Sequence, residues 1–255
     1  MSSSILYDLS KFSGIIILLL VIILVIYFEK RRQKKIKEFC HKNGFQYINT
    51  NNDAEVLKSL KKFKTHFVEA KLSFTGLLLG KKIKFLECYK VHRMSRRNRR
   101  RYSVILFDSL ENKLPKFSID YNVLGMKGLT KFLGLKSTMF PNYPTFNSKY
   151  QVFMDGKPKT MKFFERIIPY FESKLPKISL DSNGENFMLF SFNGKETNLY
   201  QDGVKYNVED LLKIIFNSWN SISEPSDYSS KFSSTSEGSN VSEYKNTYDK
   251  KNSLF

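Results

Sequence analysis

The chain has 255 residues, 41% of them hydrophobic, and a formal net charge of +18 at pH 7. This length allows one moderate domain or two small ones, and the high aromatic content is sufficient to build a core. Cys40 and Cys88 are the only cysteines, which argues against a disulfide scaffold.

The first predicted element is an uncharged apolar run at residues 12–28, FSGIIILLLVIILVIYF. At about 1.5 Å per helical residue the run spans about 25 Å, close to the ~30 Å thickness of a bilayer's hydrocarbon core. A buried core helix is the weaker interpretation, because no polar stripe follows the helix. We therefore predict a transmembrane helix at 12–28, preceded by a short non-cytoplasmic N-terminus at 1–11.

The charges on either side of this run indicate its orientation. Asp8 and Lys11 precede it and cancel, whereas a signal peptide would carry its positive charges there and a small-residue cleavage site after the run. Six cations follow the run within eight positions: Lys30, Arg31, Arg32, Lys34, Lys35 and Lys37. Positive charge beside a span favours the cytoplasmic side. We expect a single-pass protein of the inner (plasma) membrane, with its N-terminus outside and its C-terminal domain in the cytoplasm.

The span is predicted to continue as a basic juxtamembrane helix at 29–43 and to stop at Gly44. From there we expect a cytoplasmic domain at 44–222, which begins with a short strand at 45–48. Asn52 is then a candidate N-cap, because an acidic residue follows three positions later and apolar residues continue at helical spacing.

Two strands are predicted at 83–91 and 102–107, where aromatic and β-branched residues are enriched. The stretch before them, 72–79, is apolar without a clear period. Between the two strands lies the segment RMSRRNRRR, whose six arginines are Arg93, Arg96, Arg97, Arg99, Arg100 and Arg101. We expect this segment to be the connection between the strands, at the tip of a long hairpin.

The second half of the domain begins with a predicted strand at 114–121, followed by a weakly helical stretch at 123–135 and an extended segment at 150–154. An amphipathic helix is predicted at 160–175, because apolar residues recur there at intervals of three and four. Pro169 should kink this helix or end it early.

Asn183-Gly184 predicts a hairpin between short strands at 178–180 and 187–192. A last helix is predicted from the cap Asn207. From residue 223 onward serine is frequent and large apolar groups are few, which predicts a disordered tail at 223–255. Strands and helices without regular βαβ alternation indicate the α+β class, with a mixed, mainly antiparallel sheet and amphipathic helices.

The two basic segments are the candidate anion-binding sites, because eight of the nine arginines lie in them. Guanidinium groups bind phosphate as planar forks, and the phosphates nearest a membrane protein belong to lipid head groups. The twelve cations named above are therefore predicted to contact anionic phospholipid head groups, with an acidic protein as a second candidate partner. The alternative is a solvated hairpin loop. Nucleic acid is disfavoured, because no aromatic residue is interleaved among the arginines.

Catalytic and metal sites are not indicated by any motif. Cys88 and His92 stand four apart on a predicted strand, but no short-spaced pair of metal ligands accompanies them. Asp155, Asp181 and Asp202 each stand beside turn residues, which is typical of turn formation. No nucleophile elbow, phosphate-binding glycine loop or H-E-x-x-H motif occurs. We expect no metal or cofactor, and the sequence leaves open whether the protein is an enzyme.

Leu114-Pro115 and Phe117 follow a predicted hairpin, and Phe146, Tyr150 and Gly156 precede an amphipathic helix. In this arrangement, over roughly residues 75–220, the chain resembles a group of uncharacterised bacterial single-pass membrane proteins. The resemblance implies a cytoplasmic α+β domain behind an N-terminal span and a basic stretch, and it implies no activity.

The expected function is a membrane-anchored binding or scaffolding module with arginine-mediated contact to anionic lipid. The alternative is a membrane-tethered enzyme that acts on a phosphorylated or lipid substrate, with residues that only the fold brings together.

Overall fold

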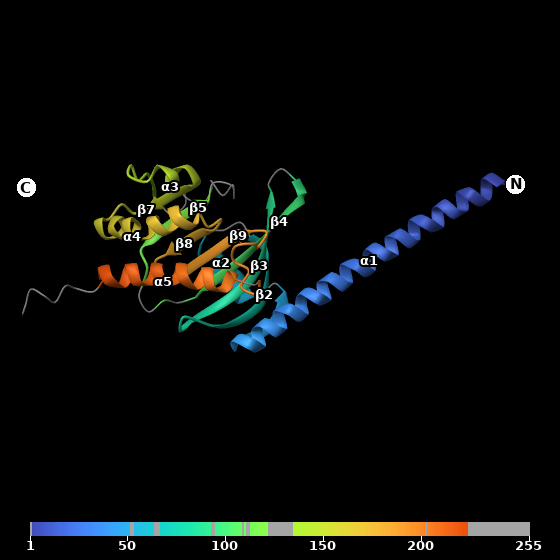
Figure 1. Cartoon of the computed structure of the whole chain (residues 1–255), viewed down its shortest axis with the longest axis horizontal. Helices are drawn as coiled ribbons and strands as arrows, with labels where there is room; N and C mark the ends of the chain where they lie inside the picture. Colours follow the sequence, from blue (N-terminus) through green and yellow to red (C-terminus); the bar gives the residue numbers. More distant parts are fainter. Residues whose placement is uncertain are drawn as a thin grey trace, which may run out of the picture. The chain divides into compact units, whose positions relative to one another are not determined.

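Nine strands form one sheet in the part of the chain that the structure describes, in the order β1-β2-β3-β4-β9-β8-β5-β7-β6 (Figure 1). Every pairing between them is antiparallel. The strands are β1 (Gln46–Asn51), β2 (Phe67–Leu78), β3 (Lys81–His92), β4 (Ser95–Phe107), β5 (Lys116–Tyr121), β6 (Lys136–Thr138), β7 (Tyr150–Met154), β8 (Ser179–Asn183) and β9 (Phe187–Phe192).

The structure is a computed structural model, and it describes residues 2–51, 54–63, 67–92, 95–108, 110, 113–121, 135–201 and 203–223. Within these ranges the side chains of residues 2–12, 51, 68, 90–92, 95–99 and 206 are not described. The helices of the described part are α1 (Ser2–Asn43), α2 (Ala54–Lys61), α3 (Pro144–Lys149), α4 (Pro158–Lys174) and α5 (Val204–Ser223).

Different helices cover the two faces of the sheet. On one face, the ring of Phe107 lies 5.8 Å from that of Phe216 on α5, and α4 packs beside α5 on this same face. Leu106 precedes Phe107 on β4, so its side chain points to the opposite face. Lys84 pairs with Leu106 across the β3–β4 ladder and therefore points to that face as well. There it forms an ion pair with Glu55 of α2 at 3.9 Å. We call these the α5 face and the α2 face.

The structure confirms the α+β class, the N-terminal apolar helix and the mainly antiparallel sheet. α1 ends one residue before Gly44, whose φ of +68° gives the left-handed conformation of a helix stop. The hairpin predicted at Asn183-Gly184 joins β8 to β9, and Gly184 has a φ of +90°. The strands at 114–121 and 150–154 are confirmed as β5 and β7.

The arginine segment differs from its prediction as a connecting loop. Residues 95–101 belong to strand β4, which ends at Phe107 as the predicted strand of 102–107 does, but begins at Ser95, seven residues before the predicted start. The backbone of Arg99 pairs with Val91 and that of Arg100 with Lys90. A run of arginines can form a strand here because the β3–β4 ladder supplies the backbone hydrogen bonds, whatever the side chains are.

Three other elements differ from what the sequence predicts. β2 includes residues 72–78 of the stretch that shows no clear period, because the register with β3 shifts between Leu72 and Phe74 and the side chains change faces there. α4 runs through Pro169 to Lys174, and the carbonyl of Glu165, which loses its helical donor there, belongs to an exposed residue on the solvent side. α5 begins at Val204, three residues before the predicted cap.

Two predicted segments lie outside the described residues. The weakly helical stretch at 123–135 is described only at residue 135, and the tail at 223–255 only at Ser223, which ends α5.

Candidate functional site: the basic segment of α1

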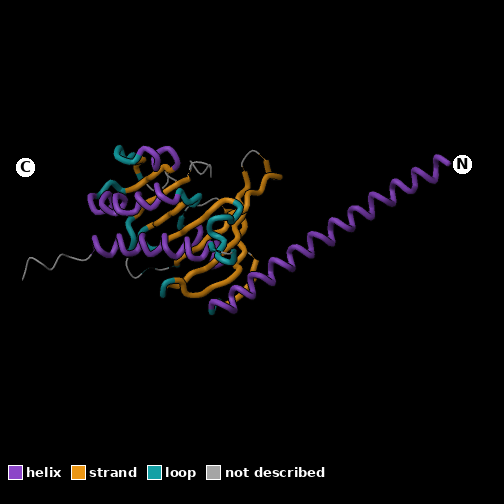
Figure 2. Tube along the Cα trace, in the orientation of Figure 1, coloured by secondary structure: helices purple, strands orange, loops and turns teal. Residues whose placement is uncertain are grey.

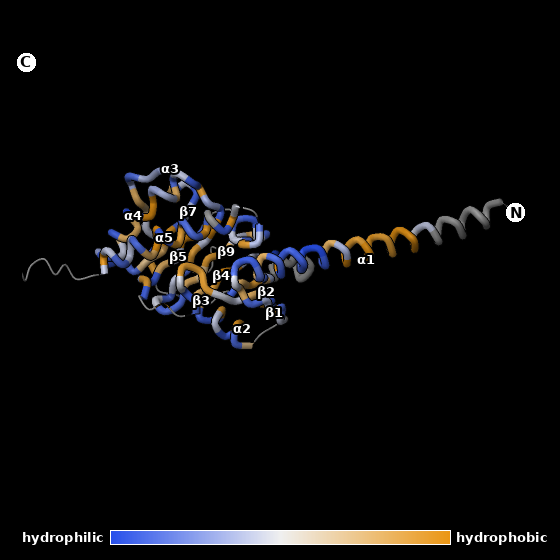
Figure 3. The backbone as a smooth tube through the Cα atoms, turned by 60° about the horizontal axis from the view of Figure 1, so that its bottom comes forward, coloured by the Kyte–Doolittle hydropathy of each residue, from blue (hydrophilic) through white to orange (hydrophobic). Residues whose placement is uncertain are grey.

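The apolar part of α1 is not packed in the core. From Ile15 to Phe28 its large side chains are 45–62% exposed, and Figure 3 shows this hydrophobic stretch clear of the domain. The helix from Ser13 to Asn43 has a window of mean hydropathy 2.4, of which none is buried. By length and composition it is able to cross a membrane.

The hydrophilic part of α1 lies against the sheet through one of its sides. Ile36 and Cys40, four residues apart, are buried, and Phe39 packs its ring 5.6 Å from Phe45 and 5.8 Å from Phe74 of β2. Glu29, seven residues before Ile36, lies on the same side of the helix. The basic segment is therefore amphipathic, and its apolar positions fix the helix to the domain.

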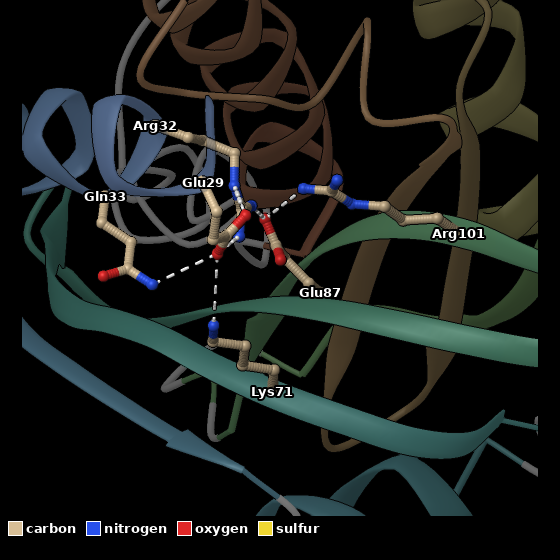
Figure 4. A network of polar contacts seen from close by, with 6 residues as sticks. All are labelled: Glu29, Arg32, Gln33, Lys71, Glu87 and Arg101. Atoms are coloured by element: carbon tan, nitrogen blue, oxygen red, sulfur yellow. Dashed lines mark hydrogen bonds and ion pairs between the residues drawn. The ribbon is translucent and has the colours of Figure 1, made fainter. Parts of the chain in front are cut away.

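A buried carboxylate joins this helix to the sheet (Figure 4). Glu87 of β3 is 1% exposed, and its Oε1 accepts hydrogen bonds from Arg32 of α1 and from Arg101 of β4, the latter at 2.5 Å. Arg32 also donates from Nε and Nη2 to the two carboxylate oxygens of Glu29, at 3.0 and 2.7 Å. Lys71 of β2 lies 3.9 Å from Glu29. The guanidinium of Arg32 is thus held between a carboxylate of its own helix and one of the sheet.

The charges in this network shift the pKa values of the groups in it. Burial opposes the charged form of Arg32, but the hydrogen bond to Glu29 and the charge of Glu87 outweigh it and raise the pKa of Arg32. The hydrogen bond from Arg32 in turn holds the pKa of Glu29 below its usual value. Burial raises the pKa of the Cys40 thiol to about 11, so this cysteine is protonated at neutral pH.

The other side of the basic segment faces solvent. Five of its six predicted cations are exposed, and they are Lys30, Arg31, Lys34, Lys35 and Lys37. Lys34 lies 3.9 Å from the exposed Glu38, and the ammonium of Lys37 lies 5.2 Å from the ring centre of Tyr47. One of the six, Arg32, is turned inward and is not available to a lipid surface in the manner predicted.

The arginines of β4 are described only in part. β4 pairs with β9 from Tyr102 onward, and the carbonyl of Arg101 accepts a hydrogen bond from the backbone N–H of Asn193 at 2.8 Å. Residues 95–100 pair with β3 alone and form the end of a ribbon that projects from the sheet (Figure 2). Arg100 is exposed, with its guanidinium 5.7 Å from the ring of Phe192, whereas Arg101 is bound to Glu87. Arg93 and the side chains of Arg96, Arg97 and Arg99 lie outside the described residues.

Two buried groups that sequence reasoning missed are Glu87 and Asp181. Asp181 was predicted to belong to a turn, but it lies within β8, opposite Ser118 of β5, and is 3% exposed. Burial raises its pKa to about 7; a hydrogen bond with Ser118 lowers the pKa, and the charge of Asp120 raises it. The prediction for Asp155 is confirmed, because its Oδ1 accepts a hydrogen bond from the backbone of Lys157 at 3.1 Å.

No group of three or more metal-ligating side chains occurs among the residues that the structure describes. Cys88 is buried on the α2 face, and burial together with the charge of Glu87 raises its pKa above the ordinary value. The side chain of His92 is outside the described set. Cys88 packs as a small apolar residue.

The chain has a distant structural resemblance to a solved protein. No family model matches the sequence, and no curated protein matches it. The crystal structure of the mycobacterial trehalose monomycolate transport factor A, TtfA, is similar to 72% of this chain and 95% of its own, with a TM-score of 0.46 and 11% sequence identity. A likeness of this size carries no statement about function.

Proposed function

We propose that the protein is a single-pass protein of the inner (plasma) membrane, with its N-terminus outside and its domain in the cytoplasm. The domain acts as a binding or scaffolding module that rests against anionic lipid head groups. The observation that carries the proposal is the two-sided basic segment of α1, which continues directly from the apolar stretch. One side docks on the sheet, and the other presents five exposed cations.

The positions of these cations suit a membrane surface. Lys30 and Arg31 follow Phe28 by two and three residues, which places them about 3–5 Å beyond the apolar stretch along the helix axis. Lys34 and Lys35 follow one turn later. Each basic residue near an anionic leaflet contributes about 1 kcal/mol, and positive charge beside a span favours the cytoplasmic side.

Docking of α1 supports a scaffolding role, because it ties the domain to the span without a flexible linker. The helix is continuous from the apolar stretch to Asn43, and both Ile36 and Arg32 contact the sheet side. A domain held in this way keeps a fixed face toward the leaflet. Among the described residues, no arrangement of side chains favours the alternative of a membrane-tethered enzyme.

The lipid contact is tested with the full chain in nanodiscs that contain spin-labelled phosphatidylserine or phosphatidylcholine. We expect electron paramagnetic resonance to show that the protein prefers phosphatidylserine. The triple variant Lys30→Gln, Arg31→Gln, Lys34→Gln should lose most of this preference, since about 1 kcal/mol per residue is removed. Salt should weaken the preference of the unaltered chain in the same direction.

The matched control is Lys149→Gln, Lys159→Gln, Lys162→Gln, which removes three exposed lysines from α3 and α4. This control should keep the preference of the unaltered chain for phosphatidylserine. An equal loss of that preference in both triple variants would contradict the proposed contact. A further variant replaces the arginines of the segment other than Arg101 by Ser, and its loss of lipid preference measures how much the ribbon contributes to the contact. These arginines are Arg93, Arg96, Arg97, Arg99 and Arg100. A reporter fused after Phe255 tests the orientation, and activity on the external side alone contradicts it.

A further inference from the structure

A groove of about 610 Å³ lies between the C-terminal part of α1 and the loop that leads into α5. Its walls include Lys35, Glu38, Phe39 and Lys42 from α1, and Tyr200 and Lys205 from the other side. The volume is within the range of small-molecule sites in proteins, about 300–1,000 Å³. Of the cations proposed to contact lipid, only Lys35 lines this groove, and the triple variant that tests the lipid contact leaves Lys35 unchanged.

Among the described residues that line the groove are three lysines and one carboxylate, so these residues together carry a positive charge. Lys35 and Lys42 are seven residues apart, which places them on one side of α1 about 10 Å from each other. Neither has a carboxylate within ion-pair distance among the described residues, and Glu38 lies 3.9 Å from Lys34, which is not part of the groove. Within the described part of the chain, these two ammonium groups are therefore open to an anion.

The third ammonium is held in place by neighbours. Lys205 donates a hydrogen bond to Oδ1 of Asn43, which itself donates to the backbone carbonyl of Phe39 at 2.8 Å. Glu209, one turn along α5, lies 3.8 Å from Lys205. An ammonium positioned before a ligand arrives loses less conformational entropy on binding than a free one.

The groove also has an apolar wall. Phe39 and Tyr200 are half-buried, and Leu199 beneath them is buried. We propose that this groove binds a phosphate monoester carried on a partly apolar body. The phosphate dianion takes the ammonium groups of Lys42 and Lys205, and the apolar body lies along Phe39 and Tyr200.

The position of Lys42 along α1 distinguishes this site from the lipid contact. Lys42 follows Phe28 by fourteen residues, about 21 Å along the helix axis, whereas Lys30 and Arg31 stand next to the apolar stretch. A phosphate monoester can come from a soluble metabolite or from a lipid head group, and both sources share the same chemistry. The test therefore uses one probe of each kind.

The experiment is calorimetric titration of the full chain in nanodiscs of pure phosphatidylcholine, which offer no anionic surface. The probes are glycerol 3-phosphate and dihexanoyl phosphatidic acid. We expect saturable binding of at least one probe, weakened about tenfold or more by Lys42→Gln and by Lys205→Gln, since each removes a charge-assisted hydrogen bond. The control Lys162→Gln on α4 should bind as the unaltered chain does.

The two probes identify the source of the phosphate. Equal affinity assigns the groove to a soluble phosphate monoester, and tighter binding of dihexanoyl phosphatidic acid assigns it to a lipid with its chains along Phe39 and Tyr200. Binding of neither probe overturns the proposal, as does binding that Lys42→Gln and Lys205→Gln leave unchanged. The triple variant of Lys30, Arg31 and Lys34 should bind each probe as the unaltered chain does, so a failure of the lipid contact is distinguishable from a failure of this site.

Discussion

Two buried carboxylates, Glu87 and Asp181, occupy opposite faces of the same sheet in opposite surroundings. Glu87 is on the α5 face, where Arg32 and Arg101 donate to it from α1 and β4. Asp181 is on the α2 face, with Ser118 and Asp120 as its polar neighbours and with Oδ2 lacking a hydrogen-bond partner among the described atoms. Burial is nearly the same for the two, so the difference comes from the partners.

The comparison shows what each region contributes. In the region around Glu87, burying the carboxylate costs free energy, because the group loses its hydrating water. Hydrogen bonds from two guanidinium groups offset this cost, and one of these groups connects α1 to the sheet. The region around Asp181 has no cation to do so, and the carboxyl is instead favoured in its protonated form up to a pH of about 7. The first is a joint between elements, and the second is a source of pH-dependent stability.

The largest expected loss of stability is that of Glu87→Gln. This substitution leaves Arg32 and Arg101 without the charge between them, and breaking a buried ion pair costs about 3–5 kcal/mol. Because both arginines are partly exposed, we expect the lower part of that range in the free energy of unfolding of the full chain in detergent micelles. Loosening of α1 should also make Cys40, buried in the docked helix, react faster with a thiol reagent.

Glu38→Gln is the matched control for this prediction. Glu38 is exposed on α1 and lies 3.9 Å from Lys34, so its loss should change the free energy of unfolding by less than about 0.5 kcal/mol. If Glu87→Gln protects Cys40 as well as the unaltered chain does, the carboxylate is not the joint between α1 and the sheet.

Asp181→Asn should act in the opposite direction. The folded pKa of Asp181, about 7, is above the unfolded value of about 4, so the unfolded chain loses its proton first as the pH rises. Its contribution therefore destabilises the fold increasingly between about pH 4 and pH 7 and is constant above. Asp181→Asn removes this penalty, and we expect the variant to gain up to ~4 kcal/mol over the unaltered chain at pH 8 and little at pH 4.

Chemical unfolding at a series of pH values checks this prediction. The control is Asp210→Asn, since Asp210 is exposed on α5 and lies 3.8 Å from Lys213. That control should show no pH-dependent gain. If Asp181→Asn gains the same free energy of unfolding at pH 4 and at pH 8, the pKa of Asp181 is not raised by folding. The contrast drawn between Asp181 and Glu87 would then be wrong.

Local sequence patterns predict the elements of this fold better than its polar contacts. The apolar stretch of α1, its stop at Gly44 and the hairpin at Gly184 follow from residue type and order alone. β2 is harder, because the register shift between Leu72 and Phe74 interrupts the alternation of its side chains. The arginine strand is harder still, since its conformation comes from the ladder with β3.

The partners of Glu87 show why the candidate site is predictable only in part. The cations of α1 and β4 are evident from the sequence, but Arg32 lies 55 positions from Glu87 and Arg101 lies 14 positions from it. Arg32 stands four residues before the buried Ile36, which places it on the docked side of the helix, whereas Arg31 is exposed. This spacing does not identify Glu87 as the partner of Arg32. Alternation along β3, where Phe85 and Glu87 share a face, is the one signal that could have marked this carboxylate as buried.

The smallest expected effect sharpens the comparison at Asp181. Ser118→Ala removes the hydrogen bond that lowers the pKa of Asp181, so this pKa should rise above its value of about 7. A hydrogen bond of this kind contributes about 1 kcal/mol, which moves the pKa by about 1. The pH at which the free energy of unfolding stops falling should shift upward by that amount. Ser137→Ala, on the exposed edge strand β6, should leave it in place. An unshifted pH in Ser118→Ala would mean that burial alone sets the proton affinity of Asp181, and that the contrast with Glu87 rests on the arginines and not on the serine.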